Sequence, residues 1–152
     1  MSLSFPFPAF HLLGLARSKS KPATIAAASK ALAAEQLPGG GWRQLASMGS
    51  DAYATGEALY ALNTAGQMAP SHPVYARGVK YLLNTQAADG SWHVKSRSIW
   101  LQPYFESGFP YGTDQWISAA GTSWAAMALP VTVASPHSAS NETQIASNKN
   151  GR

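Results

Sequence analysis

Two segments that lie 50 residues apart in the chain match each other, and this internal repeat restricts the fold more than any other feature of the sequence. Each segment has the residues of a helix, followed by a glutamine, a glycine turn and a tryptophan. The matched residues are Gln36, Gly40 and Trp42 in the first segment, and Gln86, Gly90 and Trp92 in the second. Self-similarity at a period of about 20–50 residues is the signature of repeat proteins, whose units bury their apolar faces against their neighbours.

A second pair of matched segments follows at a longer offset. Residues 54–62 match residues 121–129 at an offset of 67, so that Thr55 matches Thr122. The change from 50 to 67 places 17 additional residues between Trp92 and Thr122. Because this insertion is rich in proline, glycine and aromatic residues, we expect a structured loop there.

The pattern of apolar residues predicts an all-α fold with four main helices. They should span residues 22–36, 51–65, 73–86 and 114–129. The third has a single apolar stripe, which is typical of an outer helix with one buried face. The second and fourth are small and apolar on most sides, as expected of helices that are packed on two sides. Hairpins that alternate outer and inner helices in this way form a two-layered ring or solenoid.

The two ends of the chain differ in composition from this repeat region, which we assign to residues 22–130. Residues 1–21 contain an apolar stretch that Pro6 and Pro8 interrupt, and it is shorter than the roughly 20 residues that span a bilayer. We expect a poorly ordered leader there, or a segment that docks on a membrane surface, and the two prolines argue against a full helix. Residues 131–152 are rich in serine and asparagine and should be disordered.

The composition limits the chemistry that is available to the chain. Cysteine is absent, which excludes disulfides and thiolate zinc sites. The histidines have no partner at helical spacing that would complete a metal cluster, and no cofactor motif is present, so we expect neither a metal nor a cofactor. The net charge of +4 comes from scattered basic residues, and we expect no nucleic-acid partner.

One motif resembles that of a known family. Residues 86–92, with the sequence QAADGSW, look like the glutamine–tryptophan motif of squalene and oxidosqualene cyclases, and residues 36–42 look like a second copy. Residues 106–110 are similar to the Gly-Phe-Pro segment of squalene–hopene cyclases. The resemblance covers about residues 22–129. It implies the terpenoid cyclase and protein prenyltransferase superfamily, with about two helical-hairpin repeats of an α/α toroid.

The resemblance implies a structural role for the two motifs, because in these cyclases the motif ties adjacent repeats together. A helix leaves its last carbonyls unpaired, and a glutamine at the helix end can donate hydrogen bonds to them. The indole can then shield the amide from water, and glycine lets the backbone come close. The alternative is that the tryptophans stack on a sugar or another ligand.

The acidic residues do not form the catalytic motif of these enzymes. Cyclases protonate an alkene or epoxide with an aspartic acid from an aspartate-rich motif, whereas no two of the seven acids here are adjacent or one residue apart. Asp51 and Asp114 lie at predicted helix N-termini, where a capping carboxylate has a lowered pKa. A general acid for an alkene needs a raised pKa. We therefore predict no catalytic residue.

The insertion is the best candidate for a binding loop, because long structured loops often carry function. It is rich in aromatic residues that could contact an apolar, isoprenoid-like ligand, although such rings also serve as core packing. The candidate residues are Trp100, Tyr104, Phe105, Glu106, Phe109, Tyr111, Asp114 and Trp116.

Two functions remain open. The chain is either a squalene or terpene cyclase-like repeat fragment that is not catalytic by itself, or a non-catalytic repeat module that binds a protein, lipid or glycan. An acidic motif in a longer reading frame would favour the enzyme. Because inner helices bury their faces only against neighbouring repeats, we expect further repeats of a larger chain to cover this one, or self-association. A cytoplasmic location or a peripheral membrane contact fits the absence of a convincing targeting segment.

Overall fold

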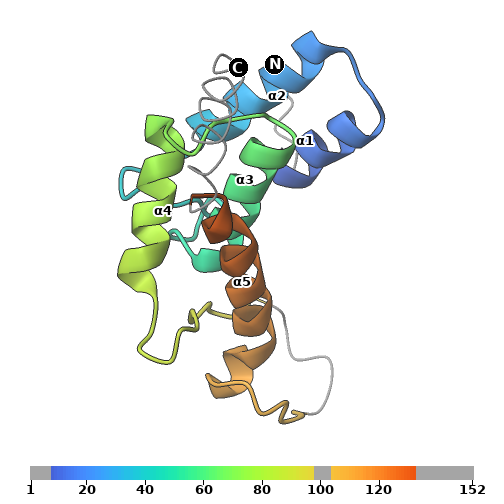
Figure 1. Cartoon of the computed structure of the whole chain (residues 1–152). Helices are drawn as coiled ribbons and strands as arrows, with labels where there is room; N and C mark the ends of the chain where they lie inside the picture. Colours follow the sequence, from blue (N-terminus) through green and yellow to red (C-terminus); the bar gives the residue numbers. More distant parts are fainter. Residues whose placement is uncertain (1–7, 98–103, 133–152) are drawn as a thin grey trace, which may run out of the picture.

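The computed structural model describes residues 8–97 and 104–132, and these residues are entirely helical apart from loops and one isolated bridge between Trp42 and Asp51 (Figure 1). The all-α prediction is thereby confirmed. The described helices are α1 (Pro8–Arg17), α2 (Pro22–Ala34), α3 (Ala52–Thr64), α4 (Pro73–Thr85) and α5 (Gln115–Ala128), with 3-10 turns at Gly112–Asp114 and Leu129–Thr132.

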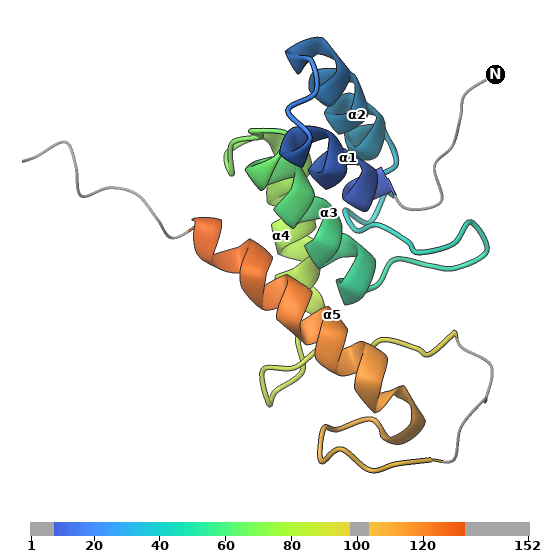
Figure 2. The ribbon, with the colours of Figure 1, turned by 90° about the vertical axis from the view of Figure 1, so that its right-hand side faces the viewer.

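The helices pack in two layers. Helices α1, α3 and α5 lie side by side, with α3 between the other two, and α2 and α4 lie behind them (Figure 2). Nine of the 13 residues of α3 are buried, whereas α4 buries three of 13. The predicted distinction between inner and outer helices therefore holds for α3 and α4, and α3 is the centre of the core, whereas α5, which was also expected to be packed on two sides, buries only five of its 14 residues.

Helix α1 was not expected. The prediction that two prolines prevent a helix near the N-terminus is wrong for residues 8–17, because Pro8 is the first residue of the helix, where the missing N–H has no intrahelical partner to lose. Pro6 lies outside the described residues. Leu12 is fully buried and Ala9 nearly so, which covers the side of α3 that four helices would have left open.

The helix starts follow ordinary capping chemistry. Asp51 accepts a hydrogen bond from the Ala54 amide at 2.8 Å, as predicted for a carboxylate at this position. Pro22 and Pro73 each begin a helix, where proline is well tolerated. These caps fix where α3 and α4 begin and therefore where the intervening loops must lie.

Glycine allows α3 and α5 to approach closely. A Cβ on Gly56 would lie 2.6 Å from the backbone nitrogen of Ala125, and a Cβ on Gly121 would lie 3.3 Å from the backbone nitrogen of Tyr53. The small residues that mark both helices in the sequence are thus explained by this contact. None of the helices in the described part of the chain is long and apolar enough to cross a bilayer.

We predict that Gly56→Ala destabilises the protein by about 1–3 kcal/mol, because the added methyl group meets the backbone of α5 and cannot be accommodated by a side-chain movement. Gly14→Ala is the matched control, since it places the same group on α1 with nothing within 4 Å. That change should be neutral or stabilising by up to about 1 kcal/mol. Urea unfolding of both variants measures the difference, and equal stabilities would contradict the close packing of α3 on α5.

Candidate functional site

The two glutamine–tryptophan motifs form the same turn. Gly40 and Gly90 have φ angles of 91° and 85°, which favour glycine. In the first motif the Leu37 amide donates to the carbonyl of Gly41 at 2.9 Å. The equivalent bond in the second motif joins residues 87 and 91 at 2.8 Å. The matched sequences therefore have matched backbones.

Both tryptophans join the outer helix before them to the inner helix after them. The indole Nε1 of Trp42 donates to the carbonyl of Leu32 at 2.8 Å, and that of Trp92 donates to the carbonyl of Leu82 at the same distance. The backbone amides of the two tryptophans donate to the hydroxyls of two matched threonines, both at 3.0 Å; these are Thr55 and Thr122. Each tryptophan is only 3% exposed, so both indoles belong to the core.

The two glutamines differ in the hydrogen bonds that they make outside their turns. The Nε2 of Gln36 donates to the carbonyl of Gly40 at 2.7 Å and to the carbonyl of Val74 on α4 at 2.8 Å, and its Oε1 accepts from Arg77. The Nε2 of Gln86 donates to the carbonyl of Gly90 at 2.9 Å and is exposed. The first motif thus reaches the next outer helix, whereas the described part of the chain places no outer helix on the second.

A buried glutamine that the sequence did not single out organises the insertion. Gln115 is fully buried at the start of α5, and its Oε1 accepts from the amide and the hydroxyl of Ser107. Its Nε2 donates to the carbonyl of Phe105 at 2.9 Å. Glu106 accepts from the Tyr104 hydroxyl and from the amide of residue 108, and the hydrogen bond from Tyr104 is the main reason that the pKa of Glu106 is lowered.

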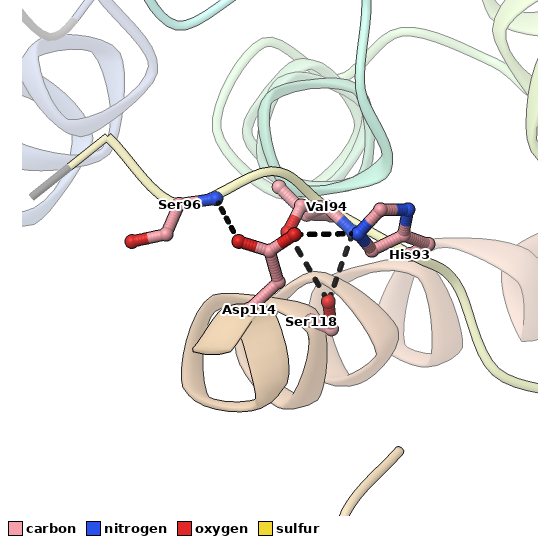
Figure 3. A network of polar contacts seen from close by, with 5 residues as sticks. All are labelled: His93, Val94, Ser96, Asp114 and Ser118. Carbon is pink, nitrogen blue, oxygen red and sulfur yellow. Dashed lines mark hydrogen bonds and ion pairs between the residues drawn. The ribbon is translucent and has the colours of Figure 1, made fainter. Parts of the chain in front are cut away.

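Asp114 does not cap α5, and this part of the capping prediction is wrong. Its side chain accepts from the Ser96 amide at 2.8 Å and contacts the His93 ring at 2.7 Å (Figure 3). Partial burial alone would raise the pKa of Asp114, but the Ser96 amide and His93 together hold it below its usual value. The carboxylate instead fixes the strand-like segment after Trp92 against the start of α5.

His93, Asp114 and Ser118 lie close together without forming a nucleophilic triad. The Ser118 hydroxyl is fully buried and bonds to the backbone of Val94, accepting from its amide at 2.9 Å and donating to its carbonyl at 3.2 Å. It is therefore not activated by the imidazole, which a catalytic serine requires. The His93 ring stacks on Tyr111, with 4.8 Å between ring centroids. Among the described residues, no three potential ligands gather to hold a metal ion.

The residues proposed as a binding loop divide into two groups. Tyr111 and Asp114 contact His93 and support the loop, and Phe109 is half-buried beside Tyr111. The rings that face solvent are Tyr104, Phe105 and Trp116, with exposed fractions of 49%, 70% and 59%, and the last two stack on each other at 6.4 Å. Trp100 lies outside the described residues.

The sequence pattern had not indicated that α3 carries a buried acid, Glu57. Glu57 is 7% exposed and accepts no hydrogen bond from the described residues. Burial raises the pKa of Glu57 to about 7, although Arg97 acts in the opposite direction, and Asp51 raises it further. The sequence feature that could have indicated it is a single acid on an inner helix whose other residues are mostly small and apolar.

Glu57 lines a cavity of about 80 Å³ between α1, the end of α2 and α3. Leu32, Trp42 and Ala58 form part of the apolar wall, and Glu35 and Arg97 also line it. The pKa of Glu35 is also raised, mainly by burial and despite the charge of Arg43. A larger hollow of about 600 Å³ adjoins the cavity and shares Glu35 and Trp42 with it.

The two-layered arrangement and its paired motifs define an all-helical repeat protein. The family model of the squalene-hopene cyclase C-terminal domain matches residues 9–147, which is most of the chain, and the chain belongs to this family. The resemblance seen in the two motifs is thereby confirmed, and the match extends from α1 to beyond α5. No curated protein and no solved structure gives a significant match.

We predict that Trp92→Ala lowers the free energy of unfolding by about 3–5 kcal/mol, because it removes a buried indole and its hydrogen bond to the carbonyl of Leu82. Trp116→Ala is the matched control, since that ring is largely exposed, and its effect should stay within about 0.5 kcal/mol. Chemical denaturation measures both. Similar losses for the two variants would show that the second motif does not bury its tryptophan.

The raised pKa of Glu57 predicts a pH dependence of stability. The folded state holds this proton to a higher pH than the unfolded chain, so the free energy of unfolding should fall as the pH rises from about 5 to 8. The part due to Glu57 should be roughly 1–3 kcal/mol, since one pKa unit corresponds to about 1.4 kcal/mol. Glu57→Gln should remove this part and flatten the profile. Identical profiles for the variant and the parent would contradict the burial of the carboxyl group.

Proposed function

We propose that this chain is a repeat segment of a cyclase-type α/α toroid and that it does not cyclise a terpene by itself. The family match and the two-layered helices support the first part of the proposal. The second part depends on the environment of the acidic residues. A general acid for an alkene must resist ionisation in a site that also holds the substrate.

The observation that carries the proposal is the small space around the one strongly perturbed acid. Glu57 has the raised pKa that a general acid needs, but it faces a cavity of only about 80 Å³. Pockets that enclose a drug-sized ligand are roughly 300–1,000 Å³, and a long isoprenoid needs at least as much. The adjoining larger hollow is lined by Glu35 and not by Glu57.

Three other described carboxylates are engaged in local structure. Asp51 caps α3, Asp89 accepts from the amide and hydroxyl of Ser91, and Asp114 holds His93 and Ser96. Their side chains therefore support turns and helix starts.

A second candidate, a module that binds a partner, is supported by the solvent-facing rings of Tyr104, Phe105 and Trp116. Large exposed aromatic residues are typical of interaction surfaces. The partner would be a protein, lipid or glycan, further repeats, or a second copy of the chain. A longer reading frame with an acidic cyclase motif would favour the first candidate over this one.

We predict that the chain, incubated alone with squalene in detergent micelles, gives no cyclised product. The physical reason is that Glu57, the acid with the most strongly raised pKa, faces only the small cavity, whereas Glu35, which lines the larger hollow, is exposed to water. Gas chromatography with mass spectrometry measures the products, with a parallel sample of Glu57→Gln. A cyclised product that forms with the parent chain and is lost in the variant would overturn the proposal and assign the acid to Glu57.

A further inference from the structure

The cavity beside Glu57 contains hydrogen-bond acceptors that have no donor. Glu57 is 7% exposed as a whole residue, and no described residue donates a hydrogen bond to its carboxyl group, which lines the cavity. Gln44 lines the same cavity, and its Oε1 is buried without a partner. The Nε2 of Gln44 donates to Asp51 at 2.7 Å, which fixes the amide so that its oxygen is the free end. Buried acceptors without a donor are costly, so the cavity favours a donor-rich group.

The rest of the cavity wall is suited to hydrocarbon. Ala9, Phe10, Leu32, Trp42 and Ala58 contribute apolar surface. One ordered water needs roughly 10–15 Å³ of such space, so a cavity of about 80 Å³ accepts a head group with a few carbon atoms.

The cavity opens toward a longer path for an apolar chain. It shares Pro8, Glu35, Trp42, Arg43 and Gln44 with the adjoining hollow of about 600 Å³. That hollow runs along the first glutamine–tryptophan motif and is also lined by Leu37. A head group at Glu57 therefore leaves room for a short alkyl tail that points toward this hollow.

The charges at the rim decide the sign of the head group. Arg43 and Arg97 line the cavity but are exposed, so water screens them. Glu57 is buried, whereas Glu35 is exposed like the two arginines and is screened in the same way. An anion would place a second negative group beside the buried carboxyl group, whereas a cation would satisfy it.

From this geometry we infer that the cavity between α1, α2 and α3 binds a primary alkylamine in its ammonium form, with Glu57 and the Oε1 of Gln44 accepting hydrogen bonds from the head group. Charge-assisted hydrogen bonds of this kind are about twice as strong as neutral ones. The alkyl chain would lie on the apolar wall and point toward the adjoining hollow. This site does not depend on the proposed function, because it needs neither a toroid nor a reaction.

Binding should depend on pH, because the ammonium group needs an ionised Glu57. The groups that face this carboxyl group or line its cavity are Glu35, Arg43, Asp51, Tyr53 and Arg97. Because the pKa of Glu57 is about 7, this residue is ionised in about nine-tenths of the molecules at pH 8 and in about three-hundredths of them at pH 5.5. The apparent dissociation constant should therefore be roughly 30-fold lower at pH 8.

The test is calorimetric titration of the whole chain with hexylammonium, with hexanol and hexanoate as matched neutral and anionic probes. We expect saturable binding of hexylammonium at pH 8, at least tenfold weaker binding of hexanol, and no binding of hexanoate. Glu57→Gln should weaken hexylammonium binding at least tenfold, since it keeps the shape and removes the charge. Asp89→Asn, an acid in a distant turn, is the matched control and should bind within about twofold of the parent.

A second measurement needs no variant. At pH 7 the binding of hexylammonium should release a fraction of a proton from Glu57, so the observed heat should change with the ionisation enthalpy of the buffer. Saturable binding without proton release, equal affinity at pH 5.5 and 8, tighter binding of hexanoate, or no saturable binding of hexylammonium would each overturn the inference.

Discussion

The hydrogen bond from a buried indole to the end of an outer helix is the interaction on which the rest of the fold depends. The indoles of Trp42 and Trp92 donate to carbonyls that lie ten residues earlier, in the last turn of an outer helix, where the regular helical hydrogen bonds end. The same residues donate their backbone amides to threonines of the next inner helix. Each tryptophan thus sets the distance between an outer and an inner helix, and the second layer follows from repeating this contact.

Much of this arrangement could be predicted because the sequence contains the glutamine–tryptophan motif and the inner helix after it in two matched copies. The shift of 17 residues between the two offsets reappears in the structure, where the bond from tryptophan to threonine spans 13 residues in the first copy and 30 in the second. Helix α1 could not be predicted, because it has no matched segment and Pro8 serves equally as a helix breaker or a first residue. The contact of His93 with Asp114 joins residues 21 apart across the insertion, and no local pattern marks it.

The two copies of the motif also differ in their surroundings, and the cavity that we propose as a binding site lies beside the first copy. The first motif lies against α4, where Gly40 is buried and Gln36 reaches Val74. The second has its glutamine and glycine exposed. The small cavity lies at the first motif, beside α1, and contains the one strongly perturbed acid of the described chain, Glu57. A family match alone does not reveal this carboxyl group, because its importance comes from burial by a helix that the repeat pattern does not include.

Hydrogen exchange of the indole N–H groups, followed by NMR on the whole chain, tests the central claim most directly. A proton that is buried and hydrogen-bonded to a helix carbonyl exchanges only when the surrounding structure opens. The indole protons of Trp42 and Trp92 should therefore exchange with protection close to that of the most protected backbone amides of α3, while the proton of exposed Trp116 should exchange at nearly the unprotected rate. Fast exchange at both Trp42 and Trp92, at the rate of Trp116, would contradict the account.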